Sequence, residues 1–314
     1  MTVEPMSDVT VSRLRSIVEW PDLDHDRYAV RDVLGRGGMG TVFRAYDAIL
    51  ERDVALKVMS SSVAETGVPA RLRVEQQTTA RLEHPGIVPI YDAGSTCDGR
   101  GFYVMRLVRG RTLEEMLAAP RGEFASDIGF RVFERVCEAV AFAHAEGVIH
   151  CDLKPSNVMI GAFGEVFVMD WGLAHQPVGG SAGEASLKAM GTPGYMAPEQ
   201  RRGAASATAL DARTDVYALG ALLRALELEP KVGTARAYAA IIERAQSARP
   251  EDRYADVVSL LDDVRRWQAG HPVLAYRESV GERLVRNGRR YQVPLVLILM
   301  YLLVRAVILV AVGR

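Results

Sequence analysis

The sequence has few cysteines, and none of them lies in a pattern that binds metal or forms a disulfide framework. Cys97, Cys137 and Cys151 are the three present, and no two of them form a Cys-x-x-Cys pair. A disulfide scaffold or a structural zinc site is therefore not expected. A reducing, cytosolic compartment is the natural setting for this part of the chain.

The sequence also lacks an excess of charge of one sign. Its 38 Lys and Arg residues balance 39 Asp and Glu residues, giving a net charge of −1 and a pI of about 6.6. No global field attracts nucleic acid, so nucleic acid is not expected as a partner. The first 20 residues mix Glu4, Asp8 and Arg13 with single apolar residues, so a signal peptide is not expected here. No internal repeat is present.

The composition is typical of a packed globular protein, and one run of residues matches the needs of a particular reaction. The 314 residues are 49% hydrophobic and 25% charged, enough for one large or two medium domains. The run from His150 to Asn157 is followed by Asp170-Trp171-Gly172. Phosphoryl transfer needs a base, a cation on the moving phosphate and two metal ligands, in this order. The residues expected in these roles are Asp152 as base, Lys154 on the phosphate, and Asn157 and Asp170 on metal.

From Tyr28 to Gln268 the chain resembles the eukaryotic-like (Hanks-type) bacterial serine/threonine protein kinase family. The strongest motif is the run from Gly191 to Glu199, which matches the substrate platform of Ser/Thr kinases along its whole length. The resemblance implies an α+β, bilobal protein kinase fold with a small β-rich N-lobe and a helical C-lobe. It also implies ATP and Mg²⁺ (or Mn²⁺) as cofactors, and proteins as substrates.

The glycine-rich run from Gly35 to Val42 fits the pattern Gly-x-Gly-x-x-Gly-x-Val. In this pattern the backbone amides can approach phosphates because no Cβ is in the way. Lys57 leaves an apolar strand, a costly place unless its ammonium meets phosphate and a carboxylate. By resemblance Glu75 is that carboxylate, and Met105 precedes a hinge at residues 106–108 that meets adenine. The residues expected at the nucleotide are Leu34, Gly35, Gly37, Gly40, Val42, Ala55, Lys57, Arg106, Val108 and Met159. Alternatives remain for each of these assignments. The glycines could form a plain turn, and Glu75 could be an ordinary exposed carboxylate on a helix. The adenine-slot residues could be plain core.

The resemblance also implies a supporting frame. Thr192 is expected to bridge Asp152 and Lys154, Glu199 to pair with Arg253, and Asp215 to hold the catalytic-loop backbone. Two features depart from the family. Cys151 replaces the arginine that pairs with an activation-segment phosphate, so we hypothesise that activity does not depend on phosphorylation of Ser181 or Ser186. The stretch between Asp215 and Arg253 is short, so a substrate-docking insertion is expected to be missing.

Hydrophobic periodicity predicts where the elements lie. Strands are expected at residues 42–45, 54–57, 87–91 and 102–105. Helices are expected at 70–82, 113–117, 128–146, 215–228, 235–245 and 256–268. The expected organisation is a leader (1–26), a protein kinase domain (27–270), a basic juxtamembrane segment (271–292) and a transmembrane helix (293–312).

The segment from Val293 to Val312 has the length and composition of a membrane span. Its 20 residues would form a helix of roughly 30 Å, and 14 of them are Leu, Ile or Val against one charge, Arg305. A buried amphipathic helix is the alternative, but it would need a polar face. Five arginines precede the span (residues 277, 283, 286, 289 and 290) and one follows it, which predicts a single-pass protein of the cell membrane with a cytoplasmic kinase domain. These arginines are also expected to contact lipid headgroups.

The sequence therefore predicts a membrane-anchored Ser/Thr protein kinase that uses Mg-ATP. Two alternatives remain: a catalytically weak pseudokinase acting as a membrane-tethered binding module, and a small-molecule kinase of similar fold. The intact Lys57, Asp152, Asn157 and Asp170 argue against the first, and the run Gly191 to Glu199 argues against the second. The substrates, the activating signal and the oligomeric state stay open.

Overall fold

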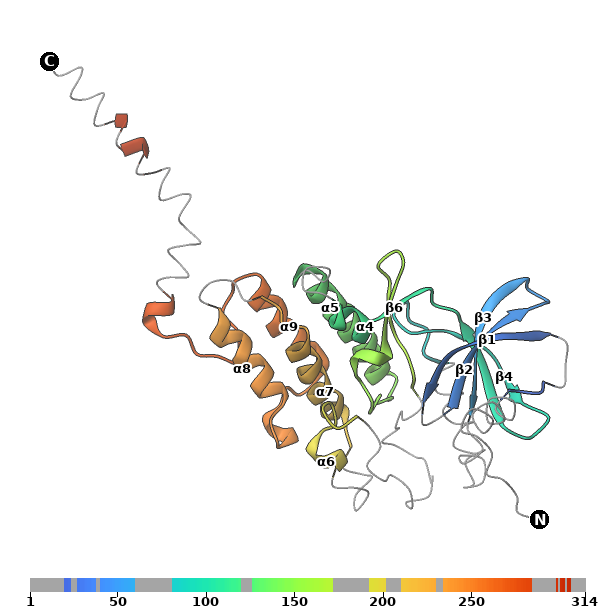
Figure 1. Cartoon of the computed structure of the whole chain (residues 1–314). Coiled ribbons are helices and arrows are strands. Elements are labelled where there is room, and N and C mark those ends of the chain that lie inside the picture. The colour runs from blue at the N-terminus through green and yellow to red at the C-terminus, as the bar shows by residue number, and fades with distance from the viewer. Residues whose placement is uncertain are drawn as a thin grey trace, which may run out of the picture.

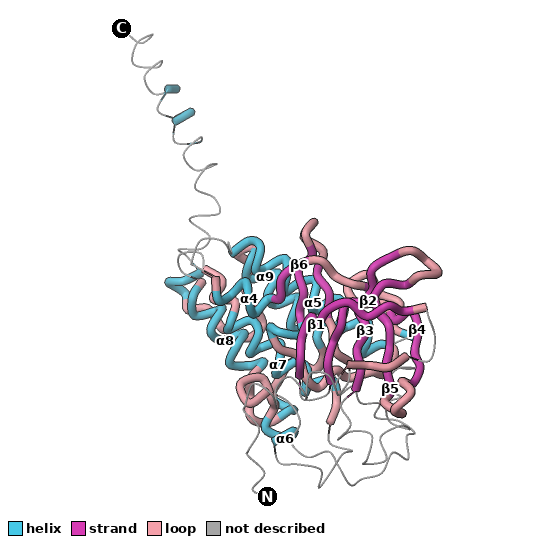
Figure 2. Tube along the Cα trace, turned by 45° about the vertical axis from the view of Figure 1, so that its right-hand side comes forward, coloured by secondary structure: helices cyan, strands magenta, loops and turns pink. Residues whose placement is uncertain are grey.

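The computed structural model describes residues 20–23, 27–37, 40–59, 81–119, 126–171, 192–201, 210–229, 234–283, 298, 300–302, 304 and 305. The strands of a five-stranded antiparallel sheet gather at one end of the molecule and the helices at the other (Figure 1). In the turned view most helices lie on the left and the strands on the right, with α5 overlapping β1 (Figure 2). The predicted bilobal arrangement is therefore confirmed.

The N-lobe sheet has the strand order β1-β2-β3-β5-β4. Its members are β1 (Tyr28–Gly37), β2 (Gly40–Asp47), β3 (Arg52–Met59), β4 (Ile90–Ser95) and β5 (Gly101–Arg106). Alternate residues of β2 are buried, with Phe43 and Ala45 on the inner face, as expected for a strand with one face in a core. The strand expected at 87–91 lies further along the chain, at Ile90–Ser95. Pro89 has no N–H for a ladder, so β4 begins only at Ile90, and Ile87 forms a single bridge to Val168.

A second, three-stranded sheet adjoins the C-lobe helices. It consists of β6 (Gly110–Thr112), β7 (Val158–Gly161) and β8 (Val166–Val168), in that order. The sequence analysis did not predict these strands, because runs of three or four residues carry too little periodicity. β7 directly follows the catalytic loop, so this sheet determines where the loop ends.

The C-lobe helices are α4 (Leu113–Ala118), α5 (Ser126–Ala145), α6 (Pro198–Arg201), α7 (Ala212–Ala225), α8 (Ala235–Ala245) and α9 (Val257–Gln268). The starts of α7 and α9 follow capping chemistry: Asp211 accepts from the Arg213 N–H and Asp256 from the Ser259 N–H. A Cβ on Gly220 in α7 would lie 2.7 Å from the Cβ of Ala245, so glycine is what lets α8 approach α7 this closely.

The residues just before β1 pack onto the N-lobe. The Trp20 ring meets Phe43 edge-on at 5.4 Å between centroids, and Pro21 is buried. The Cys97 N–H donates to the carbonyl of Asp22 over 2.8 Å. The end of the expected leader thus covers part of the sheet. Residues 1–19 lie outside the described chain.

The segment after α9 is fixed to the C-lobe by one buried carboxylate. Asp263 is fully buried and accepts hydrogen bonds from the N–H groups of Leu274 (2.6 Å) and Ala275 (2.9 Å) and from the Tyr254 hydroxyl (2.9 Å). Three donors compensate the carboxylate for its lost hydration. The first part of the expected juxtamembrane segment therefore leaves the C-lobe in a defined direction.

Candidate active site

The catalytic loop brings three expected residues together. The Lys154 ammonium contacts Asp152 Oδ2 at 2.7 Å. The Asn157 amide nitrogen donates to the Asp152 carbonyl (2.8 Å) and to Asp152 Oδ2 (3.2 Å). A short 3₁₀ turn, Pro155–Asn157, folds the chain back so that Asn157 faces Asp152. Asn157 thus keeps Asp152 oriented, and Lys154 places a positive charge beside it.

A second pair lies across the lobes. Lys57, on β3 and buried, contacts Asp170 just beyond β8. Burial alone would raise the pKa of Asp170, but the Lys57 charge, with smaller help from His150 and Lys154, lowers it below its usual value. Asp170 also has a left-handed backbone (φ 58°), a conformation that non-glycine residues adopt at a cost. The site therefore holds an ionised carboxylate against a cation.

Asp215 holds the backbone of the catalytic loop, as expected. Its fully buried carboxylate accepts from the N–H groups of His150 (2.8 Å) and Cys151 (2.9 Å) and lies 2.8 Å from His144 Nε2. Burial would raise the pKa of Asp215, and the bond to His144 and the other donors outweigh it and lower that pKa. Cys151 has a φ of 65°, so these bonds stabilise a strained backbone immediately before Asp152.

Trp171, which follows Asp170, occupies a buried apolar position. It is 3% exposed, and its ring lies 4.6 Å from that of His150. Its indole N–H donates to the Val168 carbonyl over 3.3 Å, a bond that a phenyl ring lacks. His150 in turn accepts from the Asp152 N–H at Nδ1 (3.2 Å) and faces the Met169 carbonyl with Nε2 (3.0 Å). The ring pair thus ties the catalytic loop to the strand that presents Asp170.

The expected pair of Glu199 and Arg253 is present. Two parallel bonds of 2.7 Å join the guanidinium to the carboxylate, and the Arg253 side chain is 0% exposed. Arg253 also donates to the carbonyls of Ser247 (2.8 Å) and Arg213 (2.9 Å). This pair fastens α6, and with it the end of the substrate platform, to the C-lobe.

The expected Thr192 bridge is not observed. Among the residues that the structure describes, Thr192 forms no side-chain hydrogen bond to Asp152 or Lys154, and its carbonyl accepts from the N–H groups of Tyr195 and Met196. The long Lys154 side chain reaches back two residues and contacts Asp152 directly. A threonine bridge is therefore not needed to join the two charges.

The glycines of the first hairpin fall into two kinds. A Cβ on Gly40 would lie 2.1 Å from the Val58 carbonyl oxygen, so the sheet itself requires glycine there. A Cβ on Gly35 or Gly37 would meet no atom of the described residues within 4 Å. Packing against the described residues therefore does not explain these two glycines.

The expected adenine-slot residues come from both sheets. Leu34 (β1), Val42 (β2) and Ala55 (β3) belong to the N-lobe sheet, and Met159 lies on β7. Ala55 pairs with Met105 in the strand register, which places the start of the hinge beside it. The structure places Val108 between β5 and β6.

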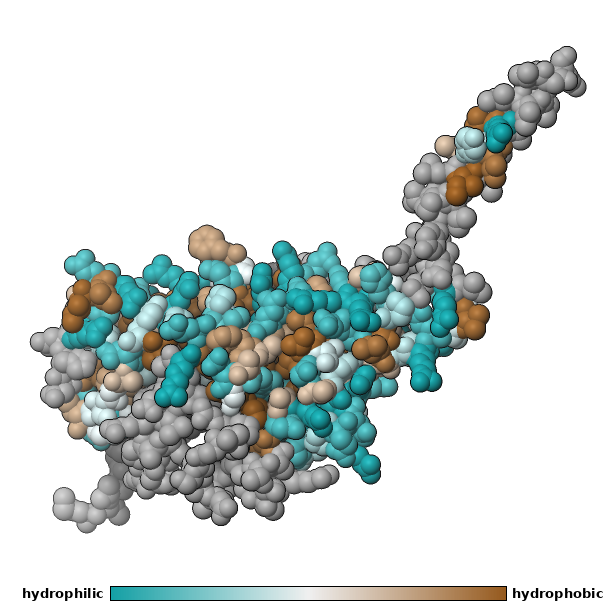
Figure 3. Space-filling model, turned by 180° about the vertical axis from the view of Figure 1, so that it is seen from behind, coloured by the Kyte–Doolittle hydropathy of each residue, from teal (hydrophilic) through white to brown (hydrophobic). Residues whose placement is uncertain are grey.

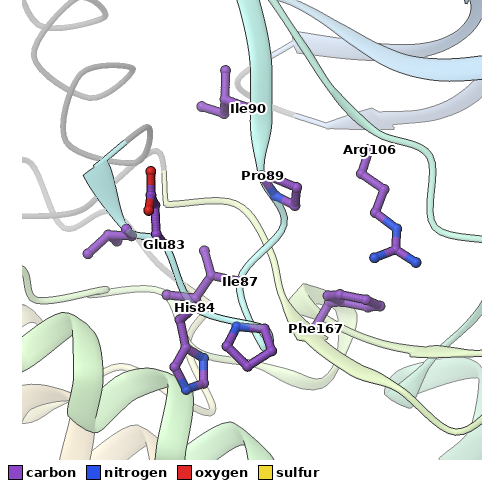
Figure 4. A pocket seen from close by; sticks show the side chains of 9 residues that line it. Glu83, His84, Ile87, Pro89, Ile90, Arg106 and Phe167 are labelled. Atoms are coloured by element: carbon purple, nitrogen blue, oxygen red, sulfur yellow. The ribbon is translucent and has the colours of Figure 1, made fainter.

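The Arg106 side chain lines a cavity of ≈ 390 Å³ (Figure 4). The cavity walls are Leu82, Glu83, His84, Pro85, Ile87, Pro89, Ile90, Arg106 and Phe167. The guanidinium lies over the Phe167 ring at 5.0 Å, and the Arg106 N–H donates to the Pro89 carbonyl.

The donor set suits a hard cation such as Mg²⁺. Asn157 uses its amide nitrogen for Asp152, and Asp170 uses one oxygen for Lys57, which leaves an oxygen on each for metal. Within the described ranges no cluster of three or more His, Cys, Asp or Glu side chains suits a metal. Mg²⁺ is commonly bound by two protein oxygens together with nucleotide phosphates.

Glu75, Gly38, Gly172 and Gly191 lie outside the described residues.

The sequence analysis missed one residue of this site. Gln200 in α6 donates to the Cys151 carbonyl over 2.7 Å and accepts from the Ala197 N–H over 2.9 Å. Its position directly after Pro198-Glu199 was the available signal, but a glutamine at a helix start has many other uses.

Comparison with known proteins identifies the class to which this fold and site belong. Residues 28–251 match the protein kinase domain family, and the chain belongs to that family.

Two similar curated proteins come from bacteria. The serine/threonine-protein kinase PknD of Protochlamydia amoebophila is 36% identical over 230 residues, covering 64% of this chain and 23% of PknD. The serine/threonine-protein kinase PknB of Mycolicibacterium smegmatis is 38% identical over 249 residues, covering 76% of this chain and 39% of PknB. The chain thus spans less than half the length of these relatives. A crystal structure of a double mutant of the Mycobacterium tuberculosis PknI kinase domain matches with a TM-score of 0.62 and 26% identity, covering 77% of this chain and 96% of that one.

Proposed function

We propose that this chain is an ATP-dependent serine/threonine protein kinase that is anchored in a membrane. The observation that carries the enzymatic part is the joint placement of Lys57 with Asp170 and of Asp152 with Lys154 and Asn157. Family membership supports the same activity. The similarity to curated Ser/Thr kinases supports Ser and Thr hydroxyls of proteins as the acceptors.

Each residue has a role that its environment supports. When bound, Mg-ATP supplies the phosphoryl group and the metal charge. Lys57 orients the phosphates, with Glu75 as its expected helix partner, while Asn157 and Asp170 hold metal. Asp152 accepts the proton of the substrate hydroxyl, and Lys154 places a positive charge where negative charge develops on the phosphate. Gly35 and Gly37 keep their backbone open for the phosphates.

Transfer of labelled phosphate tests the enzymatic proposal against the pseudokinase alternative. The full chain in detergent, supplied with γ-labelled ATP, Mg²⁺ and a generic protein acceptor, is expected to label Ser or Thr. The Asp152→Asn variant, which keeps the size of the side chain but cannot take the proton, is expected to label almost none. Equal, near-zero labelling by both proteins would favour the pseudokinase. Label on an added small molecule but on no protein would favour the small-molecule kinase.

Membrane anchoring rests on sequence and on a few described residues. No helix within the described residues is both long and apolar enough to cross a membrane, and most of the segment 293–312 lies outside them. In its described part Ile298, Met300, Tyr301, Leu302 and Val304 are each at least 50% exposed. Brown apolar surface marks this extension beyond the largely teal lobes (Figure 3). Exposed apolar side chains on a helix favour burial in lipid, which supports the proposed single-pass anchor.

Removal of the proposed anchor is expected to free an active enzyme. A chain ending at Arg290 loses the one strongly apolar segment, so it should remain in the supernatant after ultracentrifugation, with kcat within about twofold of the full chain. The full chain should sediment with membranes and resist a wash with high salt, which removes proteins held by charge alone. Truncated protein that still sediments after this wash would show that the anchor lies elsewhere.

A further inference from the structure

One glutamine side chain links the substrate platform to the catalytic loop. Gln200 donates from Nε2 to the Cys151 carbonyl (2.7 Å) and accepts at Oε1 from the Ala197 N–H (2.9 Å). A carbonyl can only accept and a backbone N–H can only donate, so these partners fix which end of the amide faces which segment. Gln200 and Cys151 lie 49 residues apart in the sequence, and this amide joins their two segments.

Gln200 binds the carbonyl of Cys151, which belongs to the peptide group that joins Cys151 to Asp152. The Cys151 N–H is bound to Asp215 Oδ1 (2.9 Å), and its carbonyl is bound to Gln200. Between these two bonds the residue keeps a left-handed backbone, with a φ of 65°. A non-glycine residue holds that conformation only where its surroundings enforce it. The direction in which Asp152 leaves the loop therefore depends on both side chains.

Position 151 itself provides no charged link to the platform. A thiol cannot form the charge-assisted bonds that a guanidinium makes with a phosphate. A neutral amide with one donor and one acceptor forms its link without any modification. It needs only the backbone groups of Cys151 and Ala197, which face it in the structure.

We propose that Gln200 is a positioning residue that locks the substrate platform and the Asp152 loop into one unit, in place of a phosphate-dependent link. The inference rests on the proposed kinase activity for its kinetic test, and on the fold alone for its structural one. According to this proposal, the position of Asp152 depends on the packing of α6 against the catalytic loop.

A Gln200→Glu variant is the sharpest test, because it changes one donor and almost no volume. The ionised carboxylate still accepts from Ala197 but faces the Cys151 carbonyl without a proton to donate. At pH 8 kcat for protein phosphorylation is expected to fall at least about tenfold, with KM for ATP changed less than about twofold. Repulsion from the carbonyl and burial favour the neutral acid and raise its pKa. As pH falls through that pKa the acid donates again, so the ratio of variant to wild-type kcat should rise towards one.

Two further variants separate positioning from simple damage. Gln200→Met lacks both partners at every pH, so its loss should match that of Gln200→Glu at pH 8 and show no recovery in acid. Gln246→Glu introduces the same charge at the end of α8, where the native amide oxygen is buried without a partner among the described groups. It should keep kcat and a flat pH ratio. Thermal unfolding midpoints confirm that all variants are folded at the assay temperature.

A readout independent of turnover keeps this proposal distinct from the kinase activity. Backbone amide exchange of the segment 150–157 should accelerate at least about tenfold in Gln200→Met, while exchange in α9 is unchanged. Unchanged exchange in 150–157, or wild-type kcat for Gln200→Glu at pH 8, would overturn the positioning role. Failure of the wild-type chain to transfer phosphate would instead overturn the proposed function and leave the exchange result to decide on Gln200.

Discussion

A Lys57→Met or Asp170→Ala variant is expected to transfer phosphate at least about 10²-fold more slowly than the wild-type chain. Lys57 is the buried cation that faces the nucleotide phosphates in the proposed site, and Asp170 is one of two oxygen donors for metal. Each change removes a charge that acts where charge builds up during transfer. The measurement is the initial rate of labelling of a generic protein acceptor at saturating Mg-ATP.

The pH dependence of the Lys57→Met variant tests the pairing itself. In the wild-type chain the pKa of Asp170 is lowered because the charge of Lys57 outweighs burial. Without the ammonium, burial dominates and that pKa rises. The residual activity should therefore disappear at a higher pH on the acid side than wild-type activity does.

Lys231→Met provides the matched control, because it removes a lysine that belongs to no motif. It should keep the wild-type rate. The catalytic assignment is wrong if either Lys57→Met or Asp170→Ala retains a near wild-type rate while folded. Thermal unfolding within a few degrees of the wild-type midpoint shows that a slow variant is folded.

The sequence predicted those parts of the site in which a buried charge needs one defined partner. Asp215 and the pair of Glu199 and Arg253 fall in this group, because a fully buried carboxylate or guanidinium is tolerated only with specific donors or acceptors. Such requirements restrict the spacing of residues within a motif, so the resemblance to the kinase family allowed these contacts to be predicted. The helices α8 and α9 were predicted within one residue of their observed bounds, since apolar periodicity marks both of them.

The contacts that escaped prediction are those in which an uncharged side chain or a backbone group has many possible partners. Nothing in the sequence distinguishes Gln200 from a surface glutamine until α6 is placed against the catalytic loop. The direct contact of Lys154 with Asp152, in place of a Thr192 bridge, depends on a side-chain conformation and not on residue type. The Asp263 bonds to Leu274 and Ala275 likewise arise only after the chain turns back beyond α9.

Glu199→Gln is expected to lower the free energy of unfolding by about 3–5 kcal/mol, because it leaves Arg253 buried without its counter-charge. A whole domain is stabilised by roughly 5–15 kcal/mol, so this one change should consume a large part of that margin. The midpoint of urea unfolding, followed by the fluorescence of Trp171 and Trp267, should shift to markedly lower urea. Glu138→Gln is the matched control: the arginines that it contacts, Arg135 and Arg265, are 69% and 44% exposed. Its cost should stay at or below about 1 kcal/mol.

The difference between wild type and Glu199→Gln should also depend on pH in one direction. Burial favours a higher pKa for Glu199, but the bonds from Arg253 outweigh it and hold that pKa below its usual value of 4.5. A carboxylate with a lowered folded-state pKa stabilises the protein above its unfolded-state pKa and loses this contribution as pH falls through the folded-state value. The stability gap should be full at pH 7 and close as pH drops below about 4.5. A gap that stays constant down to pH 3, or a loss no larger than that of Glu138→Gln, would show that Arg253 obtains its compensation from the Ser247 and Arg213 carbonyls and not from Glu199.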